Sequence, residues 1–443
     1  MIFFQSLTQA ELTELLLPLS YPKRRRDAAP LEELPAEERL ALEEAARKRA
    51  RYRAKQIFVW VYQRFVTEWD QMTDLSKDLR EWLKANVQVY RLEQRLSRQA
   101  MDGTHKFLWD LSDGKTIESV IIPAALQEKD EVGEVATEEA EDHEEQLIAR
   151  GERFAGRKAD ATVDSRQWKR LTACISSQVG CAMACKFCLT GVQGLDRHLQ
   201  THEIVTQIFE LRKLAPITNI VFMGMGEPLH NFENVAKACE IFLDADGFNF
   251  SKRKVTVSTS GLVPQIEALG QRVDVSLAIS LNGSNDEQRS LVMPVNKRWP
   301  IAELMAACQK YPLGSHRRIT FEYVMLKGID DSLEDAARVA RLMKQYMPGK
   351  AKVNLIPFNE HPASEFKRPS DETVRAFQKY LLDRGITTTV RISRGRDILA
   401  ACGQLRSIFG TARGTEKHKD WKPLPVLTPD PQQADPASAN SAG

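Results

Sequence analysis

The sequence predicts an α/β protein whose largest part is a partial parallel barrel of about six strand–helix units. Strand-like and helix-like runs alternate between Arg170 and about Gly410, which is typical of parallel α/β folds. Six units are too few for a closed eight-stranded barrel, so we expect a partial one with its chemistry at the carboxyl ends of the strands. The residues from about Met1 to Val89 have helical patterns instead. We therefore expect a smaller helical module ahead of the barrel.

The length of 443 residues exceeds what one ordinary core accommodates, and the composition changes along the chain. The predicted segments are a helical accessory domain (1–95), a β-hairpin extension (96–123), an acidic insertion (124–165), the barrel (166–412) and a tail (413–443). The insertion is acidic, poor in apolar residues and without periodicity, so we expect it to be disordered or loosely helical. The tail is rich in proline and polar residues, and we expect it to be disordered as well.

The charge, the N-terminus and the cysteine count predict a cytoplasmic protein without a membrane span. The net charge of +2 neither demands nor excludes a nucleic-acid partner. The apolar start is interrupted by acidic residues and the basic run follows it, which is the wrong order for a secretory signal. No apolar run approaches the roughly 20 residues of a membrane span. The seven cysteines, without an export signal, favour reduced and chemically used thiols.

The helical module contains an amphipathic segment from Arg49 to Phe65. Ile57, Phe58, Val61 and Phe65 fall on one face and basic residues on another. The basic face is either a solvated helix surface or an electrostatic footprint for nucleic acid.

The segment HKFLWDLSDGKTIESVIIP predicts a β-hairpin with its turn at residues 112–114. In the barrel, the strand candidates are residues 170–176, 219–226, 254–261, 274–283, 318–328, 352–359 and 387–394. The helix candidates between them include residues 202–213, 231–244, 301–311, 333–346 and 371–385.

Three cysteines in the loop after the first barrel strand have the spacing C-x3-C-x2-C. They are Cys181, Cys185 and Cys188. Structural zinc normally takes four ligands, often as two well-separated pairs, and no second pair is present. A [4Fe–4S] cluster needs four ligands, one for each iron, so three cysteines leave one iron open. The spacing therefore favours an open-site iron–sulfur cluster over structural zinc.

Polar groups and glycines follow the later strands at the same end of the barrel. In MGMGEP, the glycines allow close backbone approach, and Glu227 could accept hydrogen bonds from an ammonium group. The motifs STSG, ISLN and LIPFN add further candidates at successive strand ends. Any one of them alone is more often a turn or a cap.

The remaining cysteines fall into two groups. Cys239 and Cys308 lie in helical apolar patterns, so we expect them in the core. Cys402 precedes a glycine and follows the charged cluster RISRGRD, a context that suits a loop or helix edge near the active centre. It is a candidate reactive thiol. Cys174 lies within the first barrel strand.

Several ordered motifs together resemble one family. They are CISSQVGCAMACKFC, GMGEPL, VSTSG, AISLN, MPVNK, EYVML, NLIPFN and RGRDILAACGQL, with RAKQIFVWVY and MTDLSKDLR in the helical module. The set is similar to the RlmN and Cfr family of RNA methyltransferases, within the radical S-adenosylmethionine (SAM) superfamily. The resemblance runs from the helical module to about Gly410 and omits only the insertion and the tail.

The resemblance implies a mechanism with two SAM molecules per turnover. Cys181, Cys185 and Cys188 would bind one [4Fe–4S] cluster, with SAM at the fourth iron as the source of a deoxyadenosyl radical. Cys402 would be methylated by the first SAM and would carry the S-methyl group whose methylene radical adds to adenine. Cys174 would resolve the adduct through a transient disulfide with Cys402.

The resemblance also implies a proton acceptor and a set of SAM contacts. Glu118 would accept the ring proton of the adduct. The SAM contacts would be Gly226, Glu227, Ser258, Ser280, Leu281, Asn282 and Asn359. The family has a histidine at the position of Asn282, and we expect the asparagine to supply the hydrogen bond instead. We expect the acidic insertion to lie away from the active site, because it would repel RNA.

The implied reaction is methylation of adenine C2 in the peptidyl-transferase loop of 23S rRNA and in tRNA, at the adenosine 3′ of the anticodon. One alternative is a Cfr-like enzyme that methylates C8 in 23S rRNA. Another is a non-catalytic RNA-binding protein with zinc at the triplet and Cys174. The implied partners are rRNA, tRNA and an electron donor such as flavodoxin or ferredoxin, and we expect a monomer.

Overall fold

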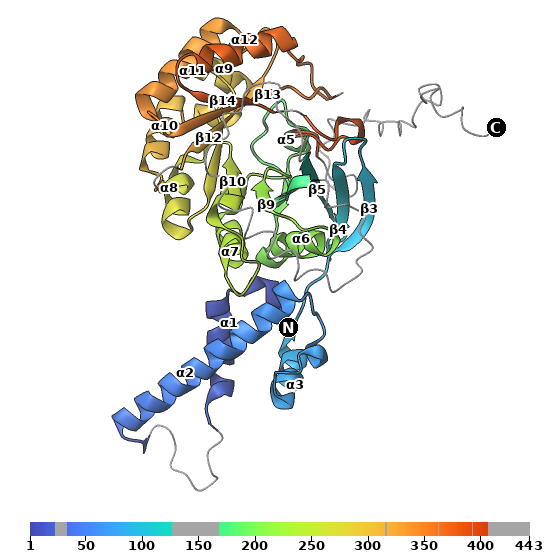
Figure 1. Cartoon of the computed structure of the whole chain (residues 1–443), viewed down its shortest axis with the longest axis vertical. Coiled ribbons are helices and arrows are strands. Elements are labelled where there is room, and N and C mark those ends of the chain that lie inside the picture. The colour runs from blue at the N-terminus through green and yellow to red at the C-terminus, as the bar shows by residue number, and fades with distance from the viewer. Residues whose placement is uncertain (23–32, 126–167, 315–316, 362, 392, 406–443) are drawn as a thin grey trace, which may run out of the picture. The chain divides into compact units, whose positions relative to one another are not determined.

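The computed structural model describes residues 1–22, 33–125, 168–314, 317–361, 363–391 and 393–405 (Figure 1). Met1–Phe409 form one compact unit, and Gly410–Gly443 form a second unit that lies outside the described residues. The predicted tail also lies outside them, as does the predicted acidic insertion except for residues 124 and 125. These two residues end a strand, so the strand continues slightly beyond the predicted boundary.

Within the described ranges, ten strands form one mixed sheet in the order β14-β13-β12-β11-β10-β9-β6-β5-β4-β3. The parallel strands are β6 (Trp168–Cys174), β9 (Asn219–Phe222), β10 (Val255–Thr259), β11 (Ser276–Ser280), β12 (Ile319–Met325), β13 (Ala351–Pro357) and β14 (Thr387–Val390). Every strand candidate of the barrel is confirmed. Six of these strands lead into a helix, and β14 closes the series.

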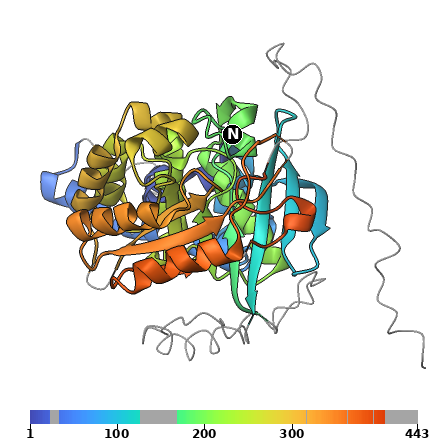
Figure 2. The same ribbon diagram turned by 90° about the horizontal axis from the view of Figure 1, so that it is seen from above.

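The barrel helices are α5 (Leu189–Gln193), α6 (Thr201–Leu214), α7 (Phe232–Leu243), α8 (Val263–Arg272), α9 (Asp286–Val292), α10 (Ile301–Lys310), α11 (Leu333–Tyr346) and α12 (Asp371–Leu382). Figure 2 shows the later helices outside the strands. This arrangement confirms the partial (β/α)6 barrel. None of the described helices is long and apolar enough to cross a membrane.

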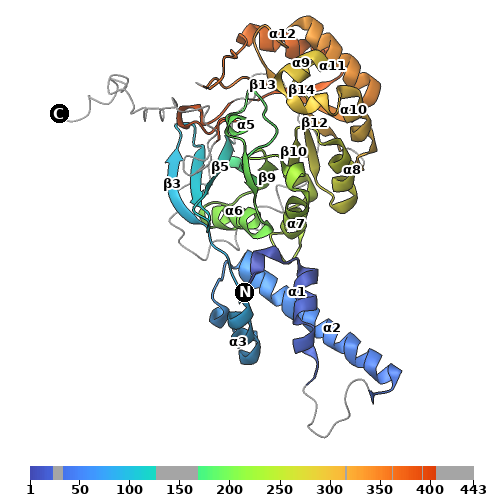
Figure 3. The same cartoon turned by 180° about the vertical axis from the view of Figure 1, so that it is seen from behind.

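The extension contains three antiparallel strands, β3 (Glu93–Gln99), β4 (His105–Asp110) and β5 (Thr116–Ala125). The hairpin of β4 and β5 was predicted, but β3 was missed. Its residues are mostly exposed, so it lacks the alternation of apolar and polar residues that identifies a half-buried strand. β5 pairs with β6, with Val120 opposite Cys174, so the extension continues the barrel sheet (Figure 3).

The N-terminal part is largely helical, as predicted, with α1 (Gln9–Leu16), α2 (Ala36–Phe58) and α3 (Lys77–Asn86). Two short strands, β1 (Ile2–Phe3) and β2 (Val87–Gln88), pair in parallel and were not predicted. The predicted apolar face is mostly buried, since Ile57, Phe58 and Val61 are fully covered. Phe65 follows the end of the helix with a φ of 57° and is only partly buried.

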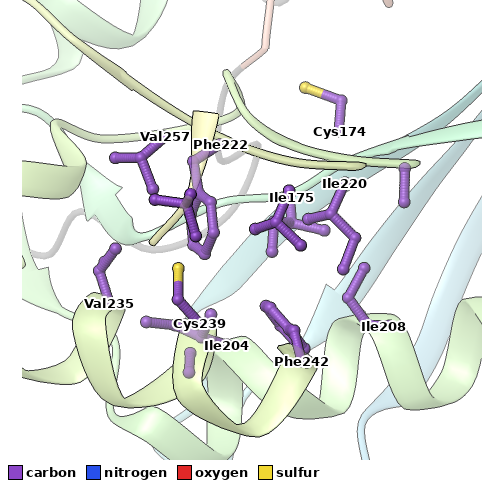
Figure 4. Packing of buried hydrophobic residues seen from close by; sticks show 14 of the residues in the cluster. Cys174, Ile175, Ile204, Ile208, Ile220, Phe222, Val235, Cys239, Phe242 and Val257 are labelled. Carbon is purple, nitrogen blue, oxygen red and sulfur yellow. The ribbon is translucent and has the colours of Figure 1, made fainter. Parts of the chain in front are cut away.

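The core below the barrel strands is formed by apolar residues of β9, β10, α6 and α7 (Figure 4). Cys239 lies in this group, and both Cys239 and Cys308 are fully buried. Their prediction as core residues is confirmed. The sulfur of Cys174 points away from the packed group in Figure 4.

Candidate functional site

Two cysteines from distant parts of the chain lie close together at the carboxyl end of β6. Cys174 is the last residue of β6 and only 3% of its surface is exposed. Cys402 lies in the loop that follows the short helical turn Arg396–Ile398. Burial, followed by the charge of Cys402, raises the pKa of Cys174 to about 12. The two thiols are therefore near enough to interact electrostatically.

Cys402 opens onto a small cavity of about 20 Å³. The cavity is lined by Ile122, Asn359, Arg391, Ser393, Arg394, Ala400, Ala401 and Cys402. The lining comes from β5, from the segment after β13 and from the segment after β14. Three distant parts of the chain thus enclose one thiol.

The cysteine triplet lies in the loop between β7 (Gln178–Gly180) and α5. Cys181, Cys185 and Cys188 are partly exposed. Burial raises the pKa of Cys181 to about 12, and the charges of the other two thiols add to burial in raising the pKa of Cys185. Three mutually interacting thiols with access to solvent fit a group held by three thiolates, because a bound metal displaces the thiol protons.

The zinc alternative requires Cys174 as a fourth ligand beside the triplet. Cys174 interacts instead with Cys402 and Arg391. Within the part of the chain that the structure describes, no three His, Cys, Asp or Glu side chains converge on a single-ion position. The zinc alternative, which needs four converging ligands, therefore gains no support from the surroundings of Cys174.

The Cys402 segment is held against the triplet loop by two hydrogen bonds. The amide of Leu189 donates to the carbonyl of Gly403 at 2.7 Å. The hydroxyl of Thr190 donates to the carbonyl of Leu405 at 2.6 Å. These contacts bring Cys402 next to the triplet loop, which no sequence spacing could predict.

Glu227 lies in the turn that follows β9, directly before the short helical turn Pro228–Asn231, and its carboxylate is buried. Its two oxygens accept hydrogen bonds from the amides of Ser260 at 2.7 Å and Leu229 at 3.0 Å. Burial raises the pKa of Glu227, and its charge in turn contributes to raising the pKa of Cys181. Glu227 is therefore next to the triplet.

Gly226 is the adjacent turn residue, and the turn requires glycine. Its φ is +102°, and an added Cβ would lie 2.5 Å from the Cβ of Gln178. A side chain is excluded here by both conformation and space. The backbone can consequently approach β7 directly before the triplet.

The expected SAM contacts on β10 and β11 lie at neighbouring strand ends. Ser258 and Ser280 are partly exposed, while Leu281 is fully buried. Ser258 pairs with Ala278 across the two strands. The structure thus places the two serines on adjacent strands of the sheet.

Asn282 makes hydrogen bonds that hold its own turn. Its side-chain oxygen accepts from the amide of Val324 at 2.8 Å, and its nitrogen donates to the sulfur of Met293 at 3.3 Å. The residue has a φ of +43°, which asparagine tolerates better than most residues. Its contact with SAM stays a prediction.

Asn359 faces the Cys402 cavity. Its side-chain nitrogen donates to the carbonyl of Cys402 at 3.3 Å. Its buried oxygen has no hydrogen-bond partner among the described residues. A buried acceptor without a partner is uncommon in proteins, so a ligand with a donor group would fit there.

Glu118 lies on β5 with a nearly inaccessible side chain (1% exposed) and forms an ion pair with Lys106 at 3.1 Å. Lys106 also donates to the carbonyl of Leu399 at 3.2 Å, and therefore connects Glu118 to the Cys402 segment. Sequence reasoning missed Lys106. Lys106 could have been predicted from the hairpin turn, because the position of the turn sets the register of the two strands. In that register Lys106 lies opposite Val120 and diagonally next to Glu118.

Two further residues were missed because their partners are distant in sequence. Arg391 follows β14 and interacts with both Cys174 and Cys402. Arg289 is fully buried and donates to the carbonyls of Leu281 and Ser260, so it ties the ends of β10 and β11 together. Its surrounding sequence, NDEQRSLV, has the pattern of an exposed helix and carries no signal for this role.

Comparison with known proteins gives matches over most of the chain. Residues 175–340 match the Radical SAM superfamily, and residues 43–89 match the ribosomal RNA large subunit methyltransferase N-terminal domain. A dual-specificity RNA methyltransferase RlmN of Geotalea uraniireducens (strain Rf4) is 46% identical, over 82% of this chain and 92% of the relative. RlmN 2 of Myxococcus xanthus (strain DK1622) is 44% identical, over 93% and 98%.

A solved structure shares the fold. It is that of a radical SAM methyltransferase from Sphaerobacter thermophilus, with 37% identity and a TM-score of 0.68. The match covers 92% of this chain and 99% of the other.

Proposed function

Because this chain belongs to the RlmN family of radical SAM methyltransferases, we propose that it methylates C2 of adenine in RNA through a thioether on Cys402. The family membership makes it a SAM-dependent RNA methyltransferase. The proposed substrates are the peptidyl-transferase loop adenosine of 23S rRNA and the tRNA adenosine 3′ of the anticodon.

The observation that supports this route is the placement of Cys174 and Cys402 beside the triplet loop. Adenine C2 is an electron-poor ring carbon, so direct polar methyl transfer to it is disfavoured. A methyl group tethered to the protein is already positioned for a different route, and intramolecular positioning removes much of an activation barrier. Of two thiols held together, one can carry the methyl group and the other can release the methylated base from it.

The superfamily implies a [4Fe–4S] cluster and SAM. Cys181, Cys185 and Cys188 would hold the cluster, with SAM at its open iron near Glu227. When bound, they supply one-electron chemistry that amino-acid side chains alone do not provide. Glu227 and the strand-end residues would orient SAM, and the unpartnered oxygen of Asn359 is available for a donor group.

Cys402 and Cys174 have separate proposed roles. Cys402 would carry the methyl group as a thioether and remain bonded to the base after addition. Cys174 would then attack the Cys402 sulfur, form a disulfide and release the methylated base. Its burial favours the neutral thiol at rest, so the resolving thiol is kept unreactive until the adduct forms.

Glu118 is the proposed acceptor of the ring proton. Its carboxyl group is paired with Lys106 at 3.1 Å, and a carboxylate can act as a general base. Lys106 links this carboxylate to the segment that carries Cys402. The acceptor and the carrier thiol therefore belong to one connected region.

The N-terminal helix α2 is the proposed RNA-binding element. Lys48, Arg49 and Arg51 are exposed on it, and Tyr52 is 63% exposed. Basic side chains contact phosphates irrespective of sequence, and an exposed aromatic ring can stack on an unpaired base. The target base must leave its stack to reach the barrel.

We also propose an electron donor of the flavodoxin or ferredoxin class, a monomeric state and a cytoplasmic location. The location is supported by the ribosomal and transfer RNA substrates and by a reaction cycle that starts from free thiols, which reducing compartments maintain.

Nucleoside mass spectrometry with synthetic standards tests the function. The reconstituted protein would receive SAM, a reductant and unmodified RNA carrying the 23S target loop, without oxygen. We expect 2-methyladenosine. 8-Methyladenosine would move the protein to the Cfr-like alternative, and no methylated base from protein with an intact cluster and either RNA class would contradict the proposal.

A further inference from the structure

The barrel has a basic edge at the end opposite to Cys174. The parallel strands begin at this end, and basic side chains lie at or just before the starts of β6, β10, β12 and β13. All of these side chains are exposed except that of Lys254, which is partly buried. The basic edge is formed by Arg170, Lys252, Arg253, Lys254, Arg318 and Lys350.

The order of the strands places these residues next to one another. Arg170 is on β6 and Lys254 directly precedes β10, and the single strand β9 lies between these two strands. The charge of Arg170 contributes, after burial, to lowering the pKa of Lys254. Arg318 and Lys350 directly precede β12 and β13, which pair with each other. The basic edge therefore has two halves, one at β6 and β10 and one at β12 and β13.

Asp274 joins the two halves of the basic edge. It precedes β11, which lies between β10 and β12. One of its carboxylate oxygens pairs with Lys252 at 2.6 Å, and the other pairs with Arg317. Two cations thus share one negative charge, and the side chain of Lys252 remains 57% exposed. The edge keeps an excess of positive charge that faces solvent.

The acidic insertion begins and ends at this same edge. Ala125 of β5 pairs with Trp168 of β6, and residues 126–167 between them lie outside the described residues. From Glu128 to Glu145 the sequence has ten acidic residues and one lysine, so the acidic run starts close to the end of β5. Cys174 is at the other end of β6, about 20 Å away along the strand.

We propose that the acidic run Glu128–Glu145 docks on the basic edge and covers it against RNA. The opposite charges attract, and tethering raises the local concentration of a binding segment to about the millimolar range. The edge from β6 to β13 spans about 24 Å. Half of residues 126–167 in extended form reaches about 70 Å, so the chain is long enough. The inference goes beyond the proposed function and does not depend on which base is methylated.

Covering this edge keeps RNA at the end of the barrel that contains the thiols. Exposed lysine and arginine side chains bind phosphates irrespective of sequence. RNA held at the basic edge would keep its target base about 20 Å from Cys174, which is unproductive. The insertion is favoured over RNA as the occupant because both of its ends lie at the edge and its charge repels phosphates there.

The test measures binding of a fluorescent oligouridine to the full chain at low salt, by fluorescence anisotropy. An insertion variant removes negative charge through Glu138→Gln, Glu139→Gln, Glu141→Gln, Asp142→Asn, Glu144→Gln and Glu145→Gln. An edge variant removes positive charge through Lys252→Ala, Arg318→Ala and Lys350→Ala. The matched control removes three exposed basic residues of the outer helices α11 and α12, through Arg341→Ala, Arg375→Ala and Lys379→Ala.

The insertion variant should bind oligouridine about tenfold or more tightly than the wild type, because the edge is uncovered. The edge variant alone should stay within about twofold of the wild type. Combining the two should abolish the gain, whereas combining the insertion variant with the control should retain it. An insertion variant with unchanged affinity, or a gain that survives in the combined variant, would overturn the proposal. A tenfold loss in the edge variant alone would also overturn it, since RNA would then be the native occupant.

Carbodiimide crosslinking separates docking from repulsion at a distance, because it joins a carboxylate to a lysine amine only where the two touch. Peptide mass spectrometry of the wild type should find crosslinks from Glu128–Glu145 to Lys252, Lys254 and Lys350, and these should decrease severalfold at high salt. Lys186 is the control, because it is exposed on the triplet loop at the other end of the barrel. Equal crosslinking to Lys186, or no crosslinks to the basic edge, would overturn the proposal.

These outcomes are independent of the proposed reaction, since oligouridine contains no adenine and neither experiment uses SAM. Failure to form methylated adenine would contradict the proposed function and leave the docking intact. Methylated adenine with no crosslinks to the basic edge would do the reverse.

Discussion

At the scale of single residues, burial and neighbours divide the cysteines into three kinds. Cys239 and Cys308 are fully buried among apolar side chains, and their helical sequence patterns predicted this. Cys174 is almost as buried, yet it lies beside Arg391 and Cys402. Its sequence context did not distinguish it from a core cysteine, because those neighbours come from the far end of the chain.

Cys308 predicts a specific dependence of stability on pH. Burial raises the pKa of its thiol to about 12, whereas an unfolded cysteine has a pKa of roughly 8.5. Since the folded pKa is the higher one, the neutral thiol stabilises the fold fully below the unfolded value, and this contribution is lost as pH rises toward 12. Between pH 8 and pH 10 the loss should be about 1–2 kcal/mol.

Urea unfolding of the wild type and Cys308→Ala at the two pH values measures this loss. The variant should be less stable at pH 8, because it leaves a small cavity, but its free energy of unfolding should fall less between pH 8 and pH 10. Parallel declines in the two proteins would show that the Cys308 thiol is not protected as described.

At the scale of elements, the parallel strands were predictable and the exposed ones were not. Several barrel strands, among them β9, β11 and β12, are mainly apolar and are followed within three residues by a glycine, and burial on both faces favours that composition. β3 has a mostly exposed sequence, so its pairing with β4 depends on the neighbour and not on its own pattern. The strand ends that carry the candidate site were predicted for the same reason as the strands.

In the turn after β9, the position of Gly226 cannot accept a side chain, so a substitution there should disturb the neighbouring site. Gly226→Ala would place a Cβ 2.5 Å from the Cβ of Gln178 at a φ of +102°, and should displace Glu227. We expect SAM affinity to fall about tenfold or more, as measured by equilibrium dialysis of the cluster-containing protein. Gly349→Ala is the control, because the φ of Gly349 is also positive, at +70°, but an added Cβ there would meet no atom within 4 Å. If both substitutions lowered SAM affinity equally, the turn after β9 would have no specific role in SAM binding.

The exposed basic face of α2 predicts a salt-dependent contribution to RNA binding. Replacing Lys48, Arg49 and Arg51 together by Ala should weaken RNA binding at low salt by about tenfold or more. The slope of log affinity against log salt should decrease by about two to three. Filter binding with tRNA at several salt concentrations measures both quantities.

A pair of substitutions on α11 controls for the loss of charge alone. Arg341→Ala with Lys344→Ala removes two exposed basic residues far from α2 in sequence and should leave the affinity nearly unchanged. If both sets weaken binding equally, the N-terminal helix has no special role.

At the scale of the whole molecule, the site forms because the C-terminal segment of the described chain packs back against the triplet loop. Local sequence patterns do not predict this contact. The segment after β14 comes back over the triplet loop, where Leu189 and Thr190 bind the carbonyls of Gly403 and Leu405. The resemblance of the sequence motifs to a known family was enough to predict Cys402 as a site residue. The ion pair of Glu118 with Lys106 and the contacts of Arg391 required the folded sheet, because their partners come from separate strands.

The most direct test of the central claim is the fate of RNA on the Cys174→Ala variant. With SAM, reductant and the 23S target loop under anaerobic conditions, denaturing gels and mass spectrometry would look for a covalent protein–RNA species. We predict that Cys174→Ala is methylated at Cys402 and then accumulates a crosslink from Cys402 to adenine, while Cys239→Ala turns over normally and Cys402→Ala neither loads a methyl group nor crosslinks. Normal turnover by Cys174→Ala without any crosslink would contradict the claim that the two thiols act as carrier and resolving group.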